Sequence, residues 1–152
     1  MNTESMQTQK ILLSDEAATL NFGKKISKYL RPGNILSLIG ELGAGKTTMV
    51  RGIISGFDAK ISDVTSPTFT LVHEFPTAKV KIYHCDFYRF KSEVELEDLG
   101  GLEFFSEPAI YLVEWLDRCP KAKKTLGNQI AVLKMQIIEG GRLCEIPKAW
   151  KI

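Results

Sequence analysis

The hydrophobic pattern along the chain first identifies buried strands and amphipathic helices. Residues 35–39 and 109–113 are short, largely apolar runs, which are typical of strands buried on both faces of a parallel sheet. A helix is predicted to begin after Ser14 as its N-cap, because apolar residues then fall on one helical face, at Ala18, Phe22, Ile26, Tyr29 and Leu30. A second helix is predicted from Lys46 to Ser55, closed by Gly56.

Alternating segments predict antiparallel hairpins beside this parallel core. Residues 69–75 and 80–86 alternate between apolar and polar positions across a short connection. Residues 130–138 and 143–146 flank Gly140-Gly141, a strong two-residue turn signal. We therefore expect one α/β domain over residues 1–152, with a mixed sheet and a frayed polar leader at residues 1–10.

Composition narrows the class of protein. The 152 residues are 44% hydrophobic and 25% charged, with a net charge of +2, which fits a globular protein and gives no reason to expect nucleic-acid binding from charge alone. The apolar runs are far shorter than the roughly 20 residues of a membrane span, so no membrane association is expected. Three widely spaced cysteines without a CxxC pair argue against a disulfide scaffold or a zinc site, and favour a reducing cytoplasm.

A glycine-rich loop supplies the clearest chemical signal. Residues 40–47 read GELGAGKT, which fits the phosphate-loop pattern GxxxxGK[ST], with an apolar strand before it and a helix after it. Glycines let backbone N–H groups ring the phosphates, and the helix N-terminus adds partial positive charge. We expect ATP and Mg²⁺ to bind here, with Lys46 on the β- and γ-phosphates and Thr47 on the metal. The expected nucleotide-binding residues of this segment are Gly43, Ala44, Gly45, Lys46, Thr47 and Thr48.

Acidic residues at strand ends are candidates for the second metal-side group. Glu114 follows the apolar run 109–113 and is suited to hold Mg²⁺ or orient the attacking water. Asp86 ends another predicted strand and competes for the same role. The triplet His84-Cys85-Asp86 looks like a metal-ligand cluster, but strand neighbours point to opposite faces, so we expect no metal site there.

Four sequence blocks together resemble the TsaE (YjeE) family, small bacterial ATPases of tRNA threonylcarbamoyladenosine biosynthesis. The blocks match that family in order and spacing, and they are GELGAGKTT at 40–48, SPTF at 66–69, HCDFYR at 84–89 and VEW at 113–115. The first block is common to many phosphate-loop proteins, whereas the other three together are specific. The resemblance implies a phosphate-loop NTPase-like, three-layer fold.

The resemblance also implies roles for individual residues. Lys46, Thr68, Asp86 and Glu114 become the catalytic candidates, Thr68 as a switch-like threonine near the γ-phosphate and Glu114 as the magnesium-side glutamate together with Thr47. Further nucleotide contacts are implied near Ser14 and Arg142. Two departures are Phe87, where the family usually has an aliphatic residue, and Leu116, where proline is usual.

In the family, ATP turnover serves a complex of the threonylcarbamoyl transferase subunit and its inactive paralogue. The resemblance therefore implies these two proteins as partners and tRNA as an indirect one. An in-line attack of water on the γ-phosphate is the expected reaction, slow in the isolated protein.

Other phosphate-loop classes remain as alternatives. The main alternative is a small-molecule kinase. Such a kinase would need an arginine-bearing lid over the phosphates, and residues 57–67, which follow the second predicted helix, contain no arginine. A GTPase would use DxxG, which occurs at 98–101 but not after an apolar strand, and no guanine-reading NKxD motif is present. A nucleotide-sensing protein without turnover differs from an ATPase in rate alone. The basic run 121–124 is interpreted as a solvated segment rather than a tRNA contact.

Overall fold

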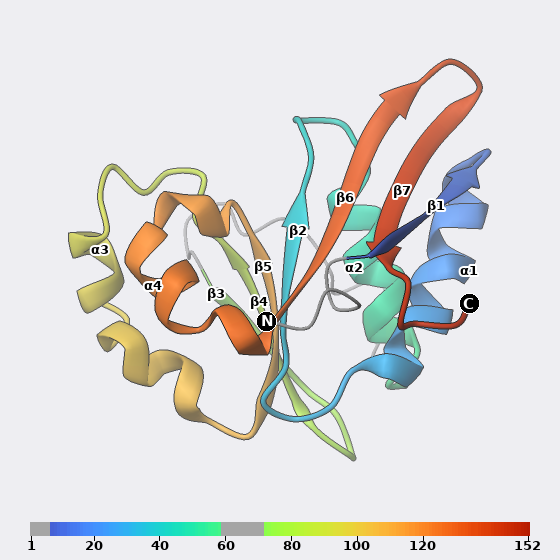
Figure 1. The fold of residues 1–152 in the computed structure, drawn as a ribbon. Coiled ribbons are helices and arrows are strands. Elements are labelled where there is room, and N and C mark those ends of the chain that lie inside the picture. Colours follow the sequence, from blue (N-terminus) through green and yellow to red (C-terminus); the bar gives the residue numbers. More distant parts are fainter. Residues whose placement is uncertain (1–6, 59–71) are drawn as a thin grey trace.

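A computed structural model of the chain describes residues 7–58 and 72–152 and shows a mixed sheet between two layers of helices (Figure 1). Within these residues seven strands form one sheet in the order β1-β7-β6-β2-β5-β4-β3. The strands are β1 (Thr8–Leu13), β2 (Ile35–Ile39), β3 (Val72–Pro76), β4 (Lys81–Asp86), β5 (Ala109–Glu114), β6 (Ile130–Ile138) and β7 (Gly141–Pro147).

Strand directions confirm the expected parallel core and antiparallel hairpins. β2 pairs in parallel with both β5 and β6, and β4 pairs in parallel with β5. β3 and β4 form one antiparallel hairpin, and β6 and β7 form another through Gly140-Gly141. The carboxyl ends of β2, β4 and β5 therefore meet at one edge of the sheet.

Helices cover the two faces of the sheet unequally. α1 (Glu16–Ile26) and α2 (Lys46–Ser55) cover one face, where they share a core with side chains from β2, β4, β5, β6 and β7. α3 (Val94–Glu97), α4 (Pro120–Thr125) and short 3-10 segments cover the other face over β4 and β5. The 3-10 segments on this second face are η4 (Gly101–Ser106), η5 (Leu116–Arg118) and η6 (Gly127–Gln129), whereas η2 (Ser27–Tyr29) directly continues α1 in the first layer. The three-layer expectation is confirmed.

The start of the chain differs from the sequence expectation. Residues 8–10 are not part of a frayed leader, because they belong to β1, which pairs antiparallel with β7 from Thr8 opposite Pro147 to Leu13 opposite Arg142. Ser14 is not the N-cap of α1. Asp15 has that role, since its side chain accepts a hydrogen bond from the N–H of Ala18 at 2.7 Å.

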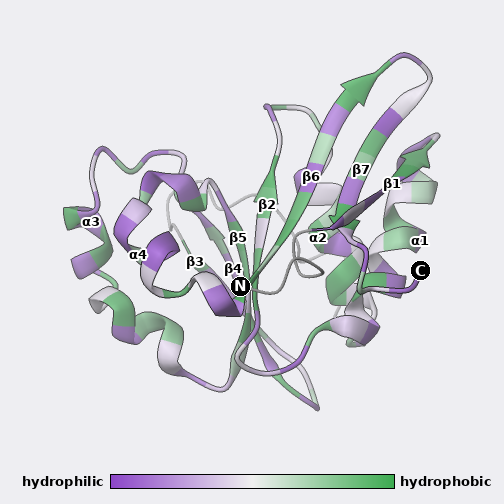
Figure 2. Ribbon diagram, in the orientation of Figure 1, coloured by the Kyte–Doolittle hydropathy of each residue, from purple (hydrophilic) through white to green (hydrophobic). Residues whose placement is uncertain are grey.

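The outer surface of α4 is polar. Hydrophilic residues predominate on α4 (Figure 2), where Lys121, Lys123 and Lys124 are exposed while Ala122 is buried. The basic run is therefore a solvated helix surface.

All three cysteines, Cys85, Cys119 and Cys144, are buried and free. Among the described residues, no helix has the length and apolar character needed to cross a membrane.

Helices α1 and α2 contact each other through glycines. A Cβ added at Gly52 in α2 would lie closer than 3.0 Å to the backbone carbonyl oxygen of Leu20 and 3.1 Å from the Cα of Gly23. A Cβ at Gly23 would in turn lie 2.7 Å from the carbonyl oxygen of Met49. The two backbones approach so closely that no side chain fits between them, and this contact fixes the position of the helix that follows the phosphate loop.

We predict that Gly52→Ala destabilises the protein by about 1–3 kcal/mol, because overpacking against backbone outweighs the gain of about 1 kcal/mol that alanine brings to a helix interior. Gly127→Ala is the matched control, since a Cβ at Gly127 meets nothing within 4 Å. Urea-induced unfolding measures both variants. A Gly52→Ala protein as stable as the parent would contradict the close helix contact.

Candidate functional site

The phosphate loop lies between β2 and α2, as the sequence predicts. Gly43 has φ 84° and Gly45 has φ 99°, backbone conformations that suit glycine and turn the loop back on itself. Gly45 is also the N-cap of α2, and the helix begins at Lys46. The N-terminus of α2 therefore opens directly onto the loop, and a helix N-terminus of this kind suits an anion.

Lys46 is buried and bound to the loop itself. Its Nζ donates to the carbonyl oxygen of Gly40 and lies 3.4 Å from that of Glu41. The same Nζ lies 4.7 Å from the ring centroid of Trp115, a cation–π distance. The positive charge of Lys46 is thus held at the mouth of the loop by groups that a phosphate can replace.

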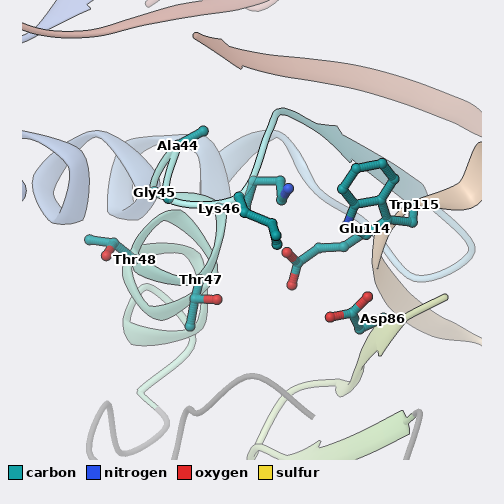
Figure 3. Close-up of a pocket in the computed structure, with 10 residues that line it drawn as sticks. Ala44, Gly45, Lys46, Thr47, Thr48, Asp86, Glu114 and Trp115 are labelled. Atoms are coloured by element: carbon teal, nitrogen blue, oxygen red, sulfur yellow. The ribbon is translucent and has the colours of Figure 1, made fainter. Parts of the chain in front are cut away.

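A cavity of about 330 Å³ joins the loop to the strand ends (Figure 3). Its lining contains most of the predicted site residues, namely Gly43, Ala44, Gly45, Lys46, Thr47, Thr48, Asp86 and Glu114, together with Leu42 and Trp115. In Figure 3 the carboxylates of Asp86 and Glu114 and the hydroxyl of Thr47 point toward one another across this space. The structure therefore brings together residues that lie up to 71 positions apart, from Gly43 to Glu114.

The two acids meet because their strands pair in parallel. Asp86 ends β4 directly opposite Glu114 at the end of β5, and the ladder continues with the N–H of Phe87 donating to the carbonyl oxygen of Glu114 at 3.0 Å. Glu114 is buried, and its Oε2 lies 2.7 Å from Nε2 of His84. Asp86 is partly exposed, and its Oδ1 accepts a hydrogen bond from the N–H of Tyr88 at 2.9 Å.

The pKa of Asp86 is raised above its ordinary value, chiefly because burial disfavours the charged carboxylate. The hydrogen bond from the N–H of Tyr88 opposes this shift, and the neighbouring Glu114 carboxylate adds to it. Two carboxylates at the ends of adjacent strands repel each other, so a cation between them is favoured.

These donors fit Mg²⁺ bound together with a nucleotide. Mg²⁺ prefers one or two carboxylates, a hydroxyl, phosphate oxygens and water, and it does not need a cage of protein ligands. In the parts of the chain that the structure describes, no group of three or more His, Cys, Asp or Glu side chains is arranged to hold a metal by itself. Thr47, Glu114 and Asp86 would hold the ion when phosphates complete its coordination.

A second hollow of about 310 Å³ lies on the other side of the loop and shares Gly43, Gly45 and Thr48 with the first. Ser14 and Arg142 both line it, so the structure places these two predicted residues together although they come from opposite ends of the chain. Nη2 of Arg142 donates to the carbonyl oxygen of Gly43 at 3.2 Å. The β6–β7 hairpin is thereby tied directly to the phosphate loop.

Trp115 forms part of the wall of the first cavity, and Tyr88 and Arg118 contact its ring. Trp115 has φ 61°, a left-handed conformation that is unusual for an aromatic residue. Its ring lies 4.9 Å from that of Tyr88, and the guanidinium of Arg118 lies over both rings at 5.6 and 5.9 Å. Leu116, where the family usually has proline, is buried at the start of η5, so the chain makes this turn without proline.

Three further residues of the sequence analysis, Phe87, Thr68 and His84, have different outcomes. Phe87, the other departure from the family pattern, is buried and stacks on Phe90 at 4.4 Å. Thr68 lies outside the described residues. The contact of His84 with Glu114 was missed, because the residues are 30 apart in the chain and the strand register alone brings them together. Side chains two apart on a strand share a face, as His84 and Asp86 do, and that was the available signal.

Comparisons with known proteins agree with the four sequence blocks. The family model for threonylcarbamoyl adenosine biosynthesis protein TsaE matches residues 13–142. The tRNA threonylcarbamoyladenosine biosynthesis protein TsaE of a Nostoc species is 38% identical over 145 residues, covering 92% of this chain and 86% of that protein. The TsaE protein of Rickettsia bellii is 36% identical over 142 residues, covering 93% of this chain and 96% of its own length.

A solved structure agrees in fold. The crystal structure of YdiB from Bacillus subtilis superposes with a TM-score of 0.67 and 24% identity, covering 92% of this chain and 84% of that chain. This likeness supports a phosphate-loop NTPase-like fold. Since the family model spans most of the 152 residues and the curated relatives match nearly the whole chain, the chain belongs to the TsaE family.

Proposed function

We propose that this protein binds and hydrolyses ATP with Mg²⁺ at its phosphate loop, and that it does so in support of threonylcarbamoyladenosine formation in tRNA in the cytoplasm. The observation that carries this proposal is the shared cavity of the loop, Thr47 and the two strand-end acids. Such an arrangement combines a phosphate cradle with carboxylates suited to a metal ion and an attacking water.

The chain's own residues account for most of the proposed reaction. Lys46 exchanges the carbonyl oxygen of Gly40 for phosphate oxygens, and the N–H groups of the loop hold the β-phosphate. Mg²⁺, when bound, neutralises the charge that develops on the β- and γ-phosphate oxygens. Thr47 and Glu114 would hold the metal side of the phosphates. Either Glu114 or Asp86 would orient the attacking water. Ser14 and Arg142 border the space for the rest of the nucleotide.

The biological role follows from family membership. Curated relatives carry the name tRNA threonylcarbamoyladenosine biosynthesis protein. We propose the same pathway for this chain, with the threonylcarbamoyl transferase subunit and its inactive paralogue as protein partners and tRNA reached through them. In this proposal ATP turnover serves the complex rather than a free metabolite, which distinguishes the protein from a small-molecule kinase.

We predict that Lys46→Ala lowers ATP affinity roughly 10- to 100-fold, because a charge-assisted hydrogen bond is worth about 1.5–3 kcal/mol. Isothermal titration calorimetry with Mg²⁺ measures the affinity. Lys79→Ala is the control, since Lys79 is an exposed lysine in the turn between β3 and β4. A Lys46→Ala protein that binds ATP as tightly as the parent would contradict the phosphate-loop assignment.

The same pair of variants tests the biological role. In cells depleted of the protein, threonylcarbamoyladenosine in bulk tRNA is expected to fall, as measured by mass spectrometry of nucleosides. The parent and Lys79→Ala are expected to restore the modification, and Lys46→Ala is expected not to. Unchanged modification after depletion would refute the pathway while leaving ATP binding intact.

We predict that Glu114→Gln keeps ATP binding but slows hydrolysis by about 100-fold or more, because the amide keeps the shape of the side chain and removes the negative charge. Single-turnover hydrolysis measures the rate, with Asp86→Asn assayed beside it. If Asp86→Asn abolishes turnover and Glu114→Gln leaves it intact, the roles of the two acids are the reverse of those proposed.

We predict that the isolated protein hydrolyses ATP slowly and that the transferase complex accelerates it roughly tenfold or more. A phosphate-loop enzyme that lacks a transition-state arginine depends on a second protein to complete its site. Steady-state ATPase assays with the partners titrated in measure the effect. A high rate for the lone protein that saturating partners and tRNA do not change would refute partner dependence.

A further inference from the structure

One buried ionisable side chain lies against the site without a role in the proposed reaction. The chain has two histidines, His73 and His84. His84 is fully buried in β4, and its Nε2 lies 2.7 Å from Oε2 of Glu114, whose side chain is itself 5% exposed. A polar contact between two buried side chains at the end of adjacent strands costs desolvation on both sides, so it needs an explanation.

The strand register explains how the contact arises. In the parallel pair of β4 and β5, His84 aligns with Leu112 and Asp86 aligns with Glu114. His84 and Asp86 share a face of the sheet, because side chains alternate along a strand. His84 is therefore the diagonal neighbour of Glu114, one step deeper in the sheet than the cavity. His84 therefore contacts Glu114 from the side of the sheet interior, whereas Asp86 is level with Glu114 on the neighbouring strand.

The other ring nitrogen of His84 bears on which ring nitrogen carries the proton. Nδ1 of His84 is buried and has no hydrogen-bond partner among the described residues. A neutral imidazole donates through one nitrogen and accepts through the other. The contact with a carboxylate oxygen needs a donor at Nε2, which leaves Nδ1 as a bare acceptor. An unpaired buried acceptor is unfavourable for folding, so stability alone does not account for a histidine at this position.

We infer that His84 is a positioning residue for Glu114: it donates Nε2–H to Oε2 and thereby fixes the carboxylate so that Oε1 is available to the cavity. The Nζ of Lys46, at the mouth of the loop, meanwhile contacts carbonyl oxygens of the loop and lies over the ring of Trp115. With Glu114 held from behind, the acid does not need Lys46 to fix its orientation, and Lys46 stays available to the phosphates. This inference rests on the proposed role of Glu114 in ATP hydrolysis.

Two substitutions at this position separate the hydrogen bond from the bulk of the ring. The amide nitrogen of glutamine can occupy the place of Nε2, so His84→Gln keeps a donor toward Glu114. His84→Leu keeps comparable bulk and removes the donor. His73→Leu is the matched control, because His73 lies opposite His84 on β3 and its recorded ring contact is with Phe75. Thermal unfolding confirms that each variant is folded.

The expected kinetic result is a loss in kcat without a comparable loss in ATP affinity. His84→Leu should lower kcat by about 10- to 100-fold, the usual effect of removing an outer partner of a metal-side ligand, while the Kd for ATP from calorimetry changes by less than about threefold. His84→Gln should recover most of the rate, and His73→Leu should match the parent. If His84→Leu matches the parent, or if folded His84→Gln is as slow as His84→Leu, the inference is overturned.

A spectroscopic readout does not depend on turnover. Long-range ¹H–¹⁵N correlation spectra of the nucleotide-free protein are expected to show His84 as the Nε2–H tautomer, with its signal identified by comparison with His73→Leu. Glu114→Gln should shift that signal. An Nδ1–H tautomer overturns the inference. A parent protein that binds no ATP or does not hydrolyse it refutes the proposed function instead, and the tautomer then decides the positioning contact by itself.

Discussion

The parallel pairing of β4, β5 and β2 is the constraint on which the site depends. Parallel strands place their carboxyl ends at one edge of a sheet, so the phosphate loop after β2, Asp86 at the end of β4 and Glu114 at the end of β5 converge without any long-range adjustment. The register matters as much as the direction. A slip of one residue between β4 and β5 would turn Glu114 to the opposite face and remove it from both Asp86 and His84.

The phosphate loop and the cavity wall are held together by contacts within the chain, and the nucleotide binding proposed above would have to exchange them. The ammonium group of Lys46 contacts a carbonyl oxygen of its own loop and the ring of Trp115. Trp115 itself has a left-handed backbone conformation that residues other than glycine rarely adopt. Uncommon backbone conformations persist where the surroundings determine them, and they cluster at functional sites. Here the surroundings are the ring of Tyr88, tilted by 54° to that of Trp115, and the guanidinium of Arg118.

Much of this architecture could be predicted from the sequence because its signals are local. The parts that could not be predicted depend mostly on pairing between distant strands. The loop motif and the helix from Lys46 to Ser55 follow from residues adjacent in the chain, and the structure reproduces them. Strand β1 was missed because Thr8 and Lys10 are polar and exposed, and their partners on β7 lie more than 130 residues away. Ser14 and Asp15 are adjacent and both are good N-cap residues, so the sequence alone does not decide which of them caps α1. The contact of His84 with Glu114 depends on strand register, which no single strand encodes.

The three buried cysteines have a consequence for how local opening of this protein can be followed. Burial raises the pKa of Cys119 to about 11 and that of Cys144 to about 12, and it raises the pKa of Cys85 further. A protonated thiol hardly reacts with alkylating or disulfide reagents, so labelling requires that its surroundings open first. Cys85 lies in β4 against the helical layer formed by α3 and α4, whereas Cys144 lies in β7 beneath α1 and α2. Labelling of Cys85 and Cys119 thus reports the opening of one helical layer and labelling of Cys144 that of the other, without the introduction of any foreign probe.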